Sequence, residues 1–271
     1  MLGRVLIVAG SDSGGGAGIQ ADLKTVIALG GYGMTAITAL TAQNTEGVFG
    51  VHAPPPEFIT EQMRLVLDDI GADCVKIGML HSVPVIEAVA NALETYAADV
   101  PVVLDPVMVA KGGAPLLEPD AIDAYRSLMP RLATVMTPNL PEAGALTDRV
   151  IETVEDQNSA IAAIRALGAK AVLLKGGHLE GDTVRDLLIE QDGVTDFVND
   201  RIASRHTHGT GCTLASAIAT GVADGMSLRD AVGRGIAYVR EAILTAPGLG
   251  RGHGPLNHGH TVAPFAWTHS D

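Results

Sequence analysis

Apolar runs alternate with amphipathic stretches along nearly the whole chain, and this alternation limits the folds that the sequence can adopt. The runs are rich in Val, Ile and Leu, as buried parallel strands are. Between them, apolar residues recur at helical spacing; in residues 18–30 the shared face is formed by Ile19, Leu23, Val26 and Ile27. Strands that alternate with helices are joined by right-handed crossovers. The sequence therefore predicts a doubly wound α/β fold with a mostly parallel central sheet and helices on both faces.

The ends of the apolar and periodic segments give the bounds of the predicted elements. Strands are predicted at 5–10, 34–40, 74–79, 100–108, 132–139 and 171–177. Helices are predicted at 18–30, 56–70, 83–96 and 153–168, and the last begins with a Thr-x-x-Asp sequence typical of a capping box. A hairpin is predicted at 183–198 with its turn at Asp192-Gly193, followed by two final helices separated at 224–227. Because no linker or repeat interrupts this pattern, we expect residues 1–271 to form a single domain.

Net charge and cysteine content narrow the class of partner and the cellular setting. The formal net charge is −13, whereas binding to a nucleic-acid backbone needs clustered Lys and Arg, so we expect a small-molecule substrate and no nucleic acid. No window is long and apolar enough for a signal sequence or a membrane span, so no membrane association is expected. The two cysteines, Cys74 and Cys212, form neither a disulfide framework nor a zinc pattern, which favours a reducing, cytoplasmic setting.

Polar or glycine-rich segments follow six of the apolar runs, at the ends where a doubly wound sheet binds its ligands. These segments are Gly10-Ser11-Asp12, Gln43-Asn44, Gly78-Met79, Asp105, Thr137-Pro138-Asn139 and Lys175-Gly176-Gly177. Because the carboxyl ends of parallel strands share one edge of the sheet, we expect a single ligand pocket there. It should join the loops after Gly10, Gln43, Asp105 and Lys175.

Residues 208–212, His-Gly-Thr-Gly-Cys, directly precede an alanine-rich segment with the character of a buried helix. The first turn of a helix has up to four unpaired N–H groups and a partial positive charge, and glycines let a ligand approach them. One Ser, Thr or Asp would be enough for a simple cap, so Gly209, Thr210 and Gly211 favour an anion-binding site. The helix N-terminus is expected to lower the pKa of the Cys212 thiol, although a free cysteine can also be a small buried apolar residue.

Three charged residues near strand ends are candidate ligands for phosphate or magnesium. Lys175 ends an apolar run before two glycines, so it is either a solvated strand end or a phosphate ligand. Asp105 and Glu142 could hold magnesium directly or through water, and either could equally be a helix cap. An anion-binding turn, a lysine, two carboxylates and a candidate base together indicate phosphoryl transfer.

Two other classes of enzyme are alternatives to a phosphotransferase. The segment 10–20, GSDSGGGAGIQ, is either a tight turn or a ligand loop, but it matches neither a simple G-x-G-x-x-G nor a Walker sequence. A nicotinamide-dependent dehydrogenase built on it would lack the acidic residue after the second strand. An acyl-transfer enzyme would need His206 or His208 to reach Cys212 from just outside the helix.

Eight segments, read in order, resemble a known family. They are AGSDSGGGAGIQADLK, TALTAQNT, VKIGML, VVLDPVM, TPNLPEA, LLKGGH, HTHGTGCTLASAIA and GHGPLNHGH, and they extend from residue 9 to residue 260. The chain resembles the hydroxymethylpyrimidine/phosphomethylpyrimidine kinases of thiamine biosynthesis, within the ribokinase superfamily. The resemblance implies ATP and Mg²⁺, and two successive phosphorylations of 4-amino-5-hydroxymethyl-2-methylpyrimidine, first to the monophosphate and then to the diphosphate. Pyridoxal or pyridoxine kinase of the same superfamily is the alternative.

The resemblance also implies roles for individual residues. It implies a pyrimidine pocket lined by Gly10, Asp22, Gln43, Met79 and Val107, with Gln43 reading the ring. It implies that Asp105 and Glu142 lie at the magnesium and phosphate region, that Lys175, Thr210 and Gly211 bind ATP, that Gly209 and Gly211 frame the anion hole, and that Cys212 is the catalytic base. It further implies a homodimer. One departure from the family sequence, Ser13-Gly14 in place of Pro-Ser, predicts a more flexible first loop.

Overall fold

The apolar runs form the strands of one sheet in the computed structural model, which describes residues 2–110 and 112–267. Along the sheet the strand order is β3-β2-β1-β4-β5-β6-β7-β8-β9. The strands are β1 (Arg4–Asp12), β2 (Tyr32–Asn44), β3 (Gly47–His52), β4 (Cys74–Ile77), β5 (Val102–Leu104), β6 (Val135–Met136), β7 (Val172–Leu174), β8 (Thr183–Ile189) and β9 (Val194–Asp200). The six central strands, in the order β2-β1-β4-β5-β6-β7, pair in parallel. At the two edges, β3 pairs antiparallel with β2, and β8 and β9 form an antiparallel hairpin beside β7. The predicted mostly parallel sheet and the predicted hairpin are confirmed.

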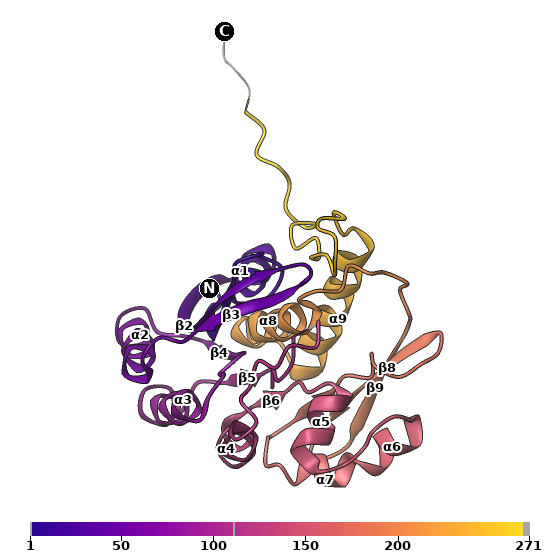
Figure 1. The fold of residues 1–271 in the computed structure, drawn as a ribbon, viewed down its shortest axis with the longest axis horizontal. Helices are drawn as coiled ribbons and strands as arrows, with labels where there is room; N and C mark the ends of the chain where they lie inside the picture. Colours follow the sequence, from indigo (N-terminus) through magenta and orange to yellow (C-terminus); the bar gives the residue numbers. More distant parts are fainter. Residues whose placement is uncertain (1, 111, 268–271) are drawn as a thin grey trace.

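Helices cover both faces of this sheet (Figure 1). They are α1 (Gly18–Ala28), α2 (Pro56–Asp69), α3 (Val83–Tyr96), α4 (Ala121–Leu128), α5 (Leu140–Thr147), α6 (Val154–Ser159), α7 (Ile161–Arg165), α8 (Thr210–Ala223) and α9 (Leu228–Leu244). Strand β1 shows why two layers are needed, because its successive side chains point to opposite faces. Leu6 and Val8 pack in the core beneath α2 to α5, whereas Val5 and Ile7 pack beneath α1, α8 and α9. The predicted doubly wound architecture is therefore confirmed.

Several details differ from the sequence-based expectations. Strand β3 and helices α4 and α5 are not among the predicted elements, and the expected helix 153–168 is divided at Ala160 into α6 and α7. The expected capping box at its start is present, since Thr153 accepts the backbone N–H of Asp156. Ile27, expected in the core, is 63% exposed, because it lies at the margin of the face that buries Ile19 and Val26.

Helix α8 is the element that matters most for the site. Its side chains Leu214, Ala215 and Ile218 are buried against the centre of the sheet. Its first turn consequently lies at the edge where the parallel strands end. Among the helices that the described residues form, none combines the length and the apolar character needed to cross a bilayer.

Candidate active site

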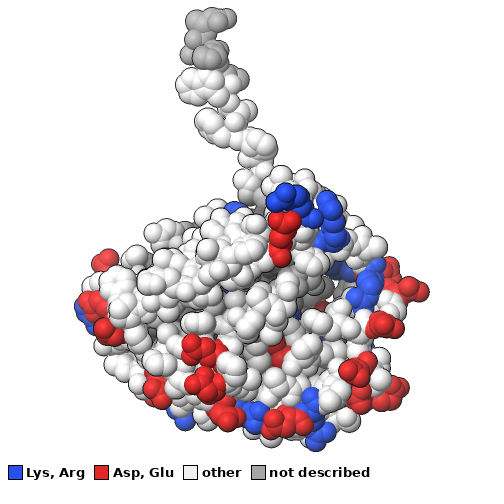
Figure 2. Space-filling view, viewed as in Figure 1, with Lys and Arg blue, Asp and Glu red and all other residues white. Residues whose placement is uncertain are grey.

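A cavity of about 830 Å³ lies at the carboxyl ends of the parallel strands, and we call it the main cavity. The four loops expected to meet do so here, because Gly10, Gln43, Asp105 and Lys175 all line it. On the face shown in Figure 2, charged side chains lie mainly along the outer margins of the molecule, and basic residues are interspersed with acidic ones. The volume falls within the usual range for small-molecule sites.

The expected pyrimidine-pocket residues divide into two groups. Gly10, Gln43, Met79 and Val107 line the main cavity. A Cβ at Gly10 would lie 3.0 Å from the sulfur of Met79, so the two residues are closely packed and a larger residue would require Met79 to move. Asp22 differs from the expectation, because its side chain is fully buried and does not line the cavity.

Asp22 instead forms a buried ion pair with Lys76, a residue that the sequence analysis did not identify. Nζ of Lys76 lies 2.9 Å from Oδ2 of Asp22, and the Ser216 hydroxyl donates to Oδ1 at 2.7 Å. Burial alone would lower the pKa of Lys76, but the neighbouring Asp22, Cys212 and Asp105 raise it above its usual value. Lys76 also lines the main cavity, so it places a fixed positive charge in the wall. The available signal was a lysine inside the apolar run CVKIG.

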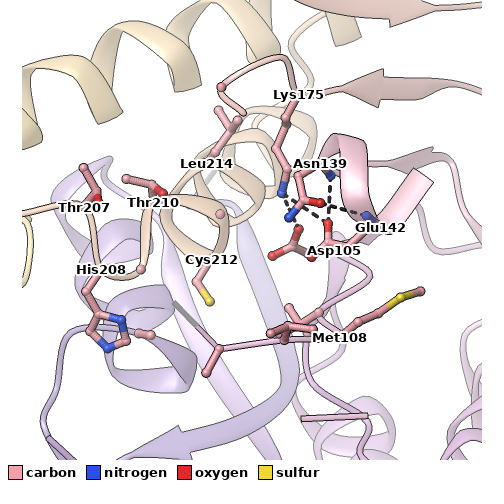
Figure 3. Close-up of a pocket in the computed structure, with 18 of the residues that line it drawn as sticks. Asp105, Met108, Asn139, Glu142, Lys175, Thr207, His208, Thr210, Cys212 and Leu214 are labelled. Carbon is pink, nitrogen blue, oxygen red and sulfur yellow. Dashed lines mark hydrogen bonds and ion pairs between the residues drawn. The ribbon is translucent and has the colours of Figure 1, made fainter. Parts of the chain in front are cut away.

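Lys175 lies beside two carboxylates in the main cavity, those of Asp105 and Glu142 (Figure 3). Its Nζ is 3.0 Å from Oδ1 of Asp105 and 4.0 Å from Oε2 of Glu142. Thr137 donates to the same Asp105 oxygen at 3.0 Å. Glu142 also caps α5 reciprocally with Asn139, through bonds of 2.8 and 2.9 Å. Glu142 is therefore both a helix cap and a neighbour of Lys175.

The charges of this group fit a divalent cation that arrives with phosphate. Burial and the nearby Asp105 raise the pKa of Glu142 to about 7, although Lys175 lowers it. Two carboxylates thus share one lysine, and the excess negative charge would be relieved by a cation. Mg²⁺ is usually held by one or two carboxylates plus substrate phosphates. Among residues 2–110 and 112–267, no group of three or more His, Cys, Asp and Glu could form a dedicated metal cage.

The turn that is expected to bind an anion leads directly into α8. Gly209 precedes α8 with φ of +82°, a backbone conformation that favours glycine. A Cβ at Gly211 would lie 3.3 Å from Nζ of Lys175 and 3.4 Å from Oδ2 of Asp105. The first turn of α8 therefore brings Gly211 directly beside Lys175 and Asp105.

Replacing Gly209 with alanine is expected to lower the free energy of unfolding by about 1–3 kcal/mol, because the positive φ is strained for a residue with a Cβ. The new methyl group would also overlap the carbonyl oxygen of Gly16, so the first turn of α8 must shift and activity should fall. Urea denaturation and steady-state kinetics measure both effects. Gly193→Ala, in the β8–β9 turn where a Cβ meets no atom within 4 Å, is the matched control. Equal stability of the Gly209 variant and the parent would contradict the conclusion that position 209 requires glycine.

Cys212 lies in the same first turn, half-buried, and lines the main cavity. Burial raises the pKa of its thiol to about 12; Lys76 lowers it, whereas Asp22 and Asp105 raise it further. The expectation that the helix N-terminus produces a lowered pKa is therefore wrong. Burial is the largest cause of the raised pKa, because it disfavours the charged thiolate. Its neighbour His208 bonds to Asp12 rather than to the thiol, which argues against a Cys–His pair.

The first glycine-rich loop is held more firmly than its sequence suggests. Ser13 donates its hydroxyl to the carbonyl of Gln43 at 2.8 Å and accepts the N–H of Gln43 at 2.9 Å. The carboxylate of Asp12 accepts three backbone N–H groups of the loop. A proline at position 13 could not make the side-chain bonds, so this chain fixes the loop by another route.

Comparison with known proteins gives consistent matches over nearly the whole chain. A family described as phosphomethylpyrimidine kinase matches residues 12–257. A hydroxymethylpyrimidine/phosphomethylpyrimidine kinase of Streptomyces coelicolor is 49% identical, with 94% of each chain covered. A thiamine biosynthesis bifunctional protein of Geobacter sulfurreducens is 53% identical over 94% of this chain, which spans about half (52%) of that relative's length.

Solved structures agree with these relatives. The crystal structure of an ADP complex of Bacillus subtilis pyridoxal kinase superposes with a TM-score of 0.87 and 35% identity, covering 96% of this chain and 98% of that one. This chain therefore shares the fold of that pyridoxal kinase. The Streptomyces relative and the Bacillus structure are both named as kinases. With a family match that extends from the first glycine-rich loop to the segment after α9, the chain belongs to the phosphomethylpyrimidine kinase family of phosphotransferases.

Proposed function

We propose that the protein transfers a phosphoryl group from ATP to the hydroxymethyl group of 4-amino-5-hydroxymethyl-2-methylpyrimidine, and then to the resulting monophosphate, in thiamine biosynthesis. One observation carries the proposal. A single cavity has a polar amide, Gln43, on one wall and a phosphate-binding group, Lys175 with the first turn of α8, on another. The relatives named above support the choice of an aminopyrimidine substrate.

The residues of the phosphate-binding group would have different roles in phosphoryl transfer. Lys175 and the N–H groups of Thr210 and Gly211 would bind the ATP phosphates, and Asp105 and Glu142 would hold Mg²⁺. When bound, Mg²⁺ would supply positive charge that neutralises the negative charge of the phosphates. The N–H groups that follow Gly209 would stabilise the charge of the transferred group, since they are already oriented before the substrate binds.

Incubation of the purified protein with ATP, Mg²⁺ and the pyrimidine alcohol tests this function directly. We expect release of ADP with the alcohol and, in a separate reaction, with its monophosphate. Pyridoxine is the comparison substrate, because the similarity to a pyridoxal kinase structure favours that activity as the second candidate. ADP release with pyridoxine alone would overturn the proposal in favour of the second candidate.

Gln43→Leu is expected to weaken binding of the aminopyrimidine by about 1–3 kcal/mol, the effect of leaving buried polar groups unpaired. The Michaelis constant for ATP should change little, because Lys175 and α8 bind the phosphates elsewhere in the cavity. The measurement is the Michaelis constant of each substrate in turn. Gln191→Leu replaces an exposed amide in the β8–β9 turn and serves as the control. Equal constants for the pyrimidine in the Gln43 variant and the parent would remove Gln43 from this role.

The proposal includes a homodimer of single-domain chains in the cytoplasm. The β2–β3 hairpin supports an interface, because it exposes Leu40 at 46%, Phe49 at 74% and Val51 at 36%. Analytical ultracentrifugation of the parent and of Phe49→Ser tests it. A monomeric parent at micromolar concentration would contradict the dimer.

A further inference from the structure

Three polar side chains are joined by contacts along one wall of the main cavity. Nε2 of His208 lies 2.9 Å from Oδ2 of Asp12 and 3.2 Å from Nε2 of Gln43. Asp12 is 2% exposed and His208 9% exposed, and all three residues line the cavity. Figure 3 shows His208 near Thr207 and Thr210, on the loop that leads into α8. None of the roles proposed above uses His208.

The other partners of Asp12 determine which ring nitrogen of His208 carries a hydrogen. Burial opposes ionisation of Asp12, but its hydrogen bonds outweigh burial and place its pKa below the usual value. Three of those bonds come from backbone N–H groups, at 2.8, 3.0 and 2.8 Å: those of Gly14, Gly16 and Ala17. An ionised carboxylate only accepts hydrogen bonds, so Nε2 of His208 must donate to Asp12. The same nitrogen then cannot accept an N–H from Gln43.

The contacts of Thr41 independently indicate that the Gln43 amide must be turned over. Its hydroxyl lies 2.9 Å from the carbonyl oxygen of Ser11 and 3.1 Å from Oε1 of Gln43. The hydroxyl has one hydrogen, and the carbonyl of Ser11 can only accept it, so Thr41 must accept from Gln43 instead of donating. The two ends of an amide have nearly the same shape, so the hydrogen-bond partners decide which end is oxygen. With the amide turned over, its nitrogen donates to Thr41, and its oxygen shares, as a second acceptor in a three-centre bond, the hydrogen that Nε2 of His208 donates to Asp12. Both conflicts then disappear.

We propose that His208, held by Asp12, determines the substrate specificity of the cavity by fixing the Gln43 amide with its oxygen toward His208 and its nitrogen toward Thr41. This rests on the proposed function, in which Gln43 reads the ring. The fixed amide keeps one free lone pair on oxygen and one free hydrogen on nitrogen. It therefore selects a ring edge with an N–H donor on the His208 side and an acceptor on the Thr41 side. His208 is a positioning residue, because it acts through Gln43.

An aminopyrimidine has this donor and acceptor side by side, in its amino group and the adjacent ring nitrogen. A pyridoxine-type ring has a phenolic oxygen instead of the amino group, and its ring nitrogen is not adjacent to that oxygen. An amide free to turn over would suit either ring, whereas a fixed amide leaves polar groups unpaired on the wrong one. Sites built on hydrogen bonds discriminate strongly for this reason.

His208→Leu and His208→Gln form the enzymatic test, because the glutamine amide can place an N–H near the position of the imidazole Nε2. We expect His208→Leu to raise the Michaelis constant for the pyrimidine alcohol by roughly 10- to 100-fold, with a much smaller change in kcat and in the constant for pyridoxine. His208→Gln should restore most of the preference. His52→Leu, at an exposed histidine of β3, is the control. An unchanged preference in the leucine variant, or a glutamine variant as impaired as leucine, would overturn the proposal.

A second measurement needs no substrate and no variant. In the unmodified protein, ¹⁵N NMR of the imidazole should show hydrogen on Nε2 of His208, and a coupling across the hydrogen bond to the side-chain carbonyl ¹³C of Gln43 should show that the amide oxygen is one of its two acceptors. Hydrogen on Nδ1 alone would overturn the proposal even if every kinetic result agreed. A parent that phosphorylates no aminopyrimidine would instead contradict the proposed function, and the NMR result would still decide the orientation of Gln43.

Discussion

Replacing Cys212 with alanine is expected to lower turnover by roughly 10²–10⁴-fold, the usual contribution of a general base. The thiol lies in the first turn of α8 and lines the main cavity, beside the N–H groups that we propose bind the transferred phosphoryl group. Steady-state turnover with saturating ATP and pyrimidine alcohol measures the effect. The Michaelis constants should change much less, because Lys175 and Gln43 bind the two substrates through other contacts.

The raised pKa of Cys212 makes this prediction depend on pH in a defined direction. With burial raising the pKa to about 12, the thiol is protonated near neutral pH, and the fraction that can accept a proton grows as pH rises. Turnover of the parent should therefore still be rising above neutral pH. Cys212→Asp should keep more activity than alanine and reach its plateau at lower pH, because a carboxyl group ionises far more readily than a thiol.

Thiol alkylation supplies a further check on Cys212. The thiolate is the reactive form, so iodoacetamide should react slowly near neutral pH and faster as pH rises. Bound substrate should protect the enzyme from inactivation. Cys74→Ala is the matched control, because the Cys74 side chain is fully buried in β4 and does not line the cavity. Full turnover in Cys212→Ala would refute the base role and leave charge stabilisation by the α8 amides as the contribution of this turn.

The fold could be predicted from the sequence because its main signal is local. Runs such as residues 5–10 are apolar at every position, and only a strand buried on both faces needs that pattern. Strand β3 and helix α4 gave no such signal. β3 leaves Phe49 74% exposed at the edge of the sheet, and α4 buries only Ala121 and Tyr125. Elements with few buried side chains carry weak periodicity, so their existence depends on tertiary neighbours.

The candidate site was predictable where a residue type follows a strand end. Gln43, Asp105 and Lys175 were identified in this way, and all three line the main cavity. The pKa of Cys212 was not predictable, because the sequence shows the helix N-terminus but not the burial that opposes it. The position of Asp22 was missed for a related reason. Its partner Lys76 is 54 residues away, and no spacing rule connects them.

Replacing Lys76 with methionine is expected to destabilise the fold by about 3–5 kcal/mol, the effect of breaking a buried ion pair from one side. Methionine fills much of the same volume, but the carboxylate of Asp22 would keep only the hydroxyl of Ser216 and remain without access to water. The free energy of unfolding in urea at neutral pH measures the loss. Arg64→Met, which breaks the surface pairs with Glu61 and Asp68 on α2, is the control and should have almost no effect.

Two comparisons separate a buried charge from a simple loss of packing. Removing the positive partner raises the pKa of Asp22 further above its unfolded value. A carboxyl group with a raised folded pKa stabilises the protein below its unfolded pKa and loses that contribution as pH rises, so the penalty of Lys76→Met should shrink toward pH of about 4. The double variant Lys76→Met with Asp22→Leu should recover most of the stability, because no unpaired charge is left. A penalty that is independent of pH and persists in the double variant would show that Lys76 contributes by packing, and that its charge in the cavity wall has no structural role.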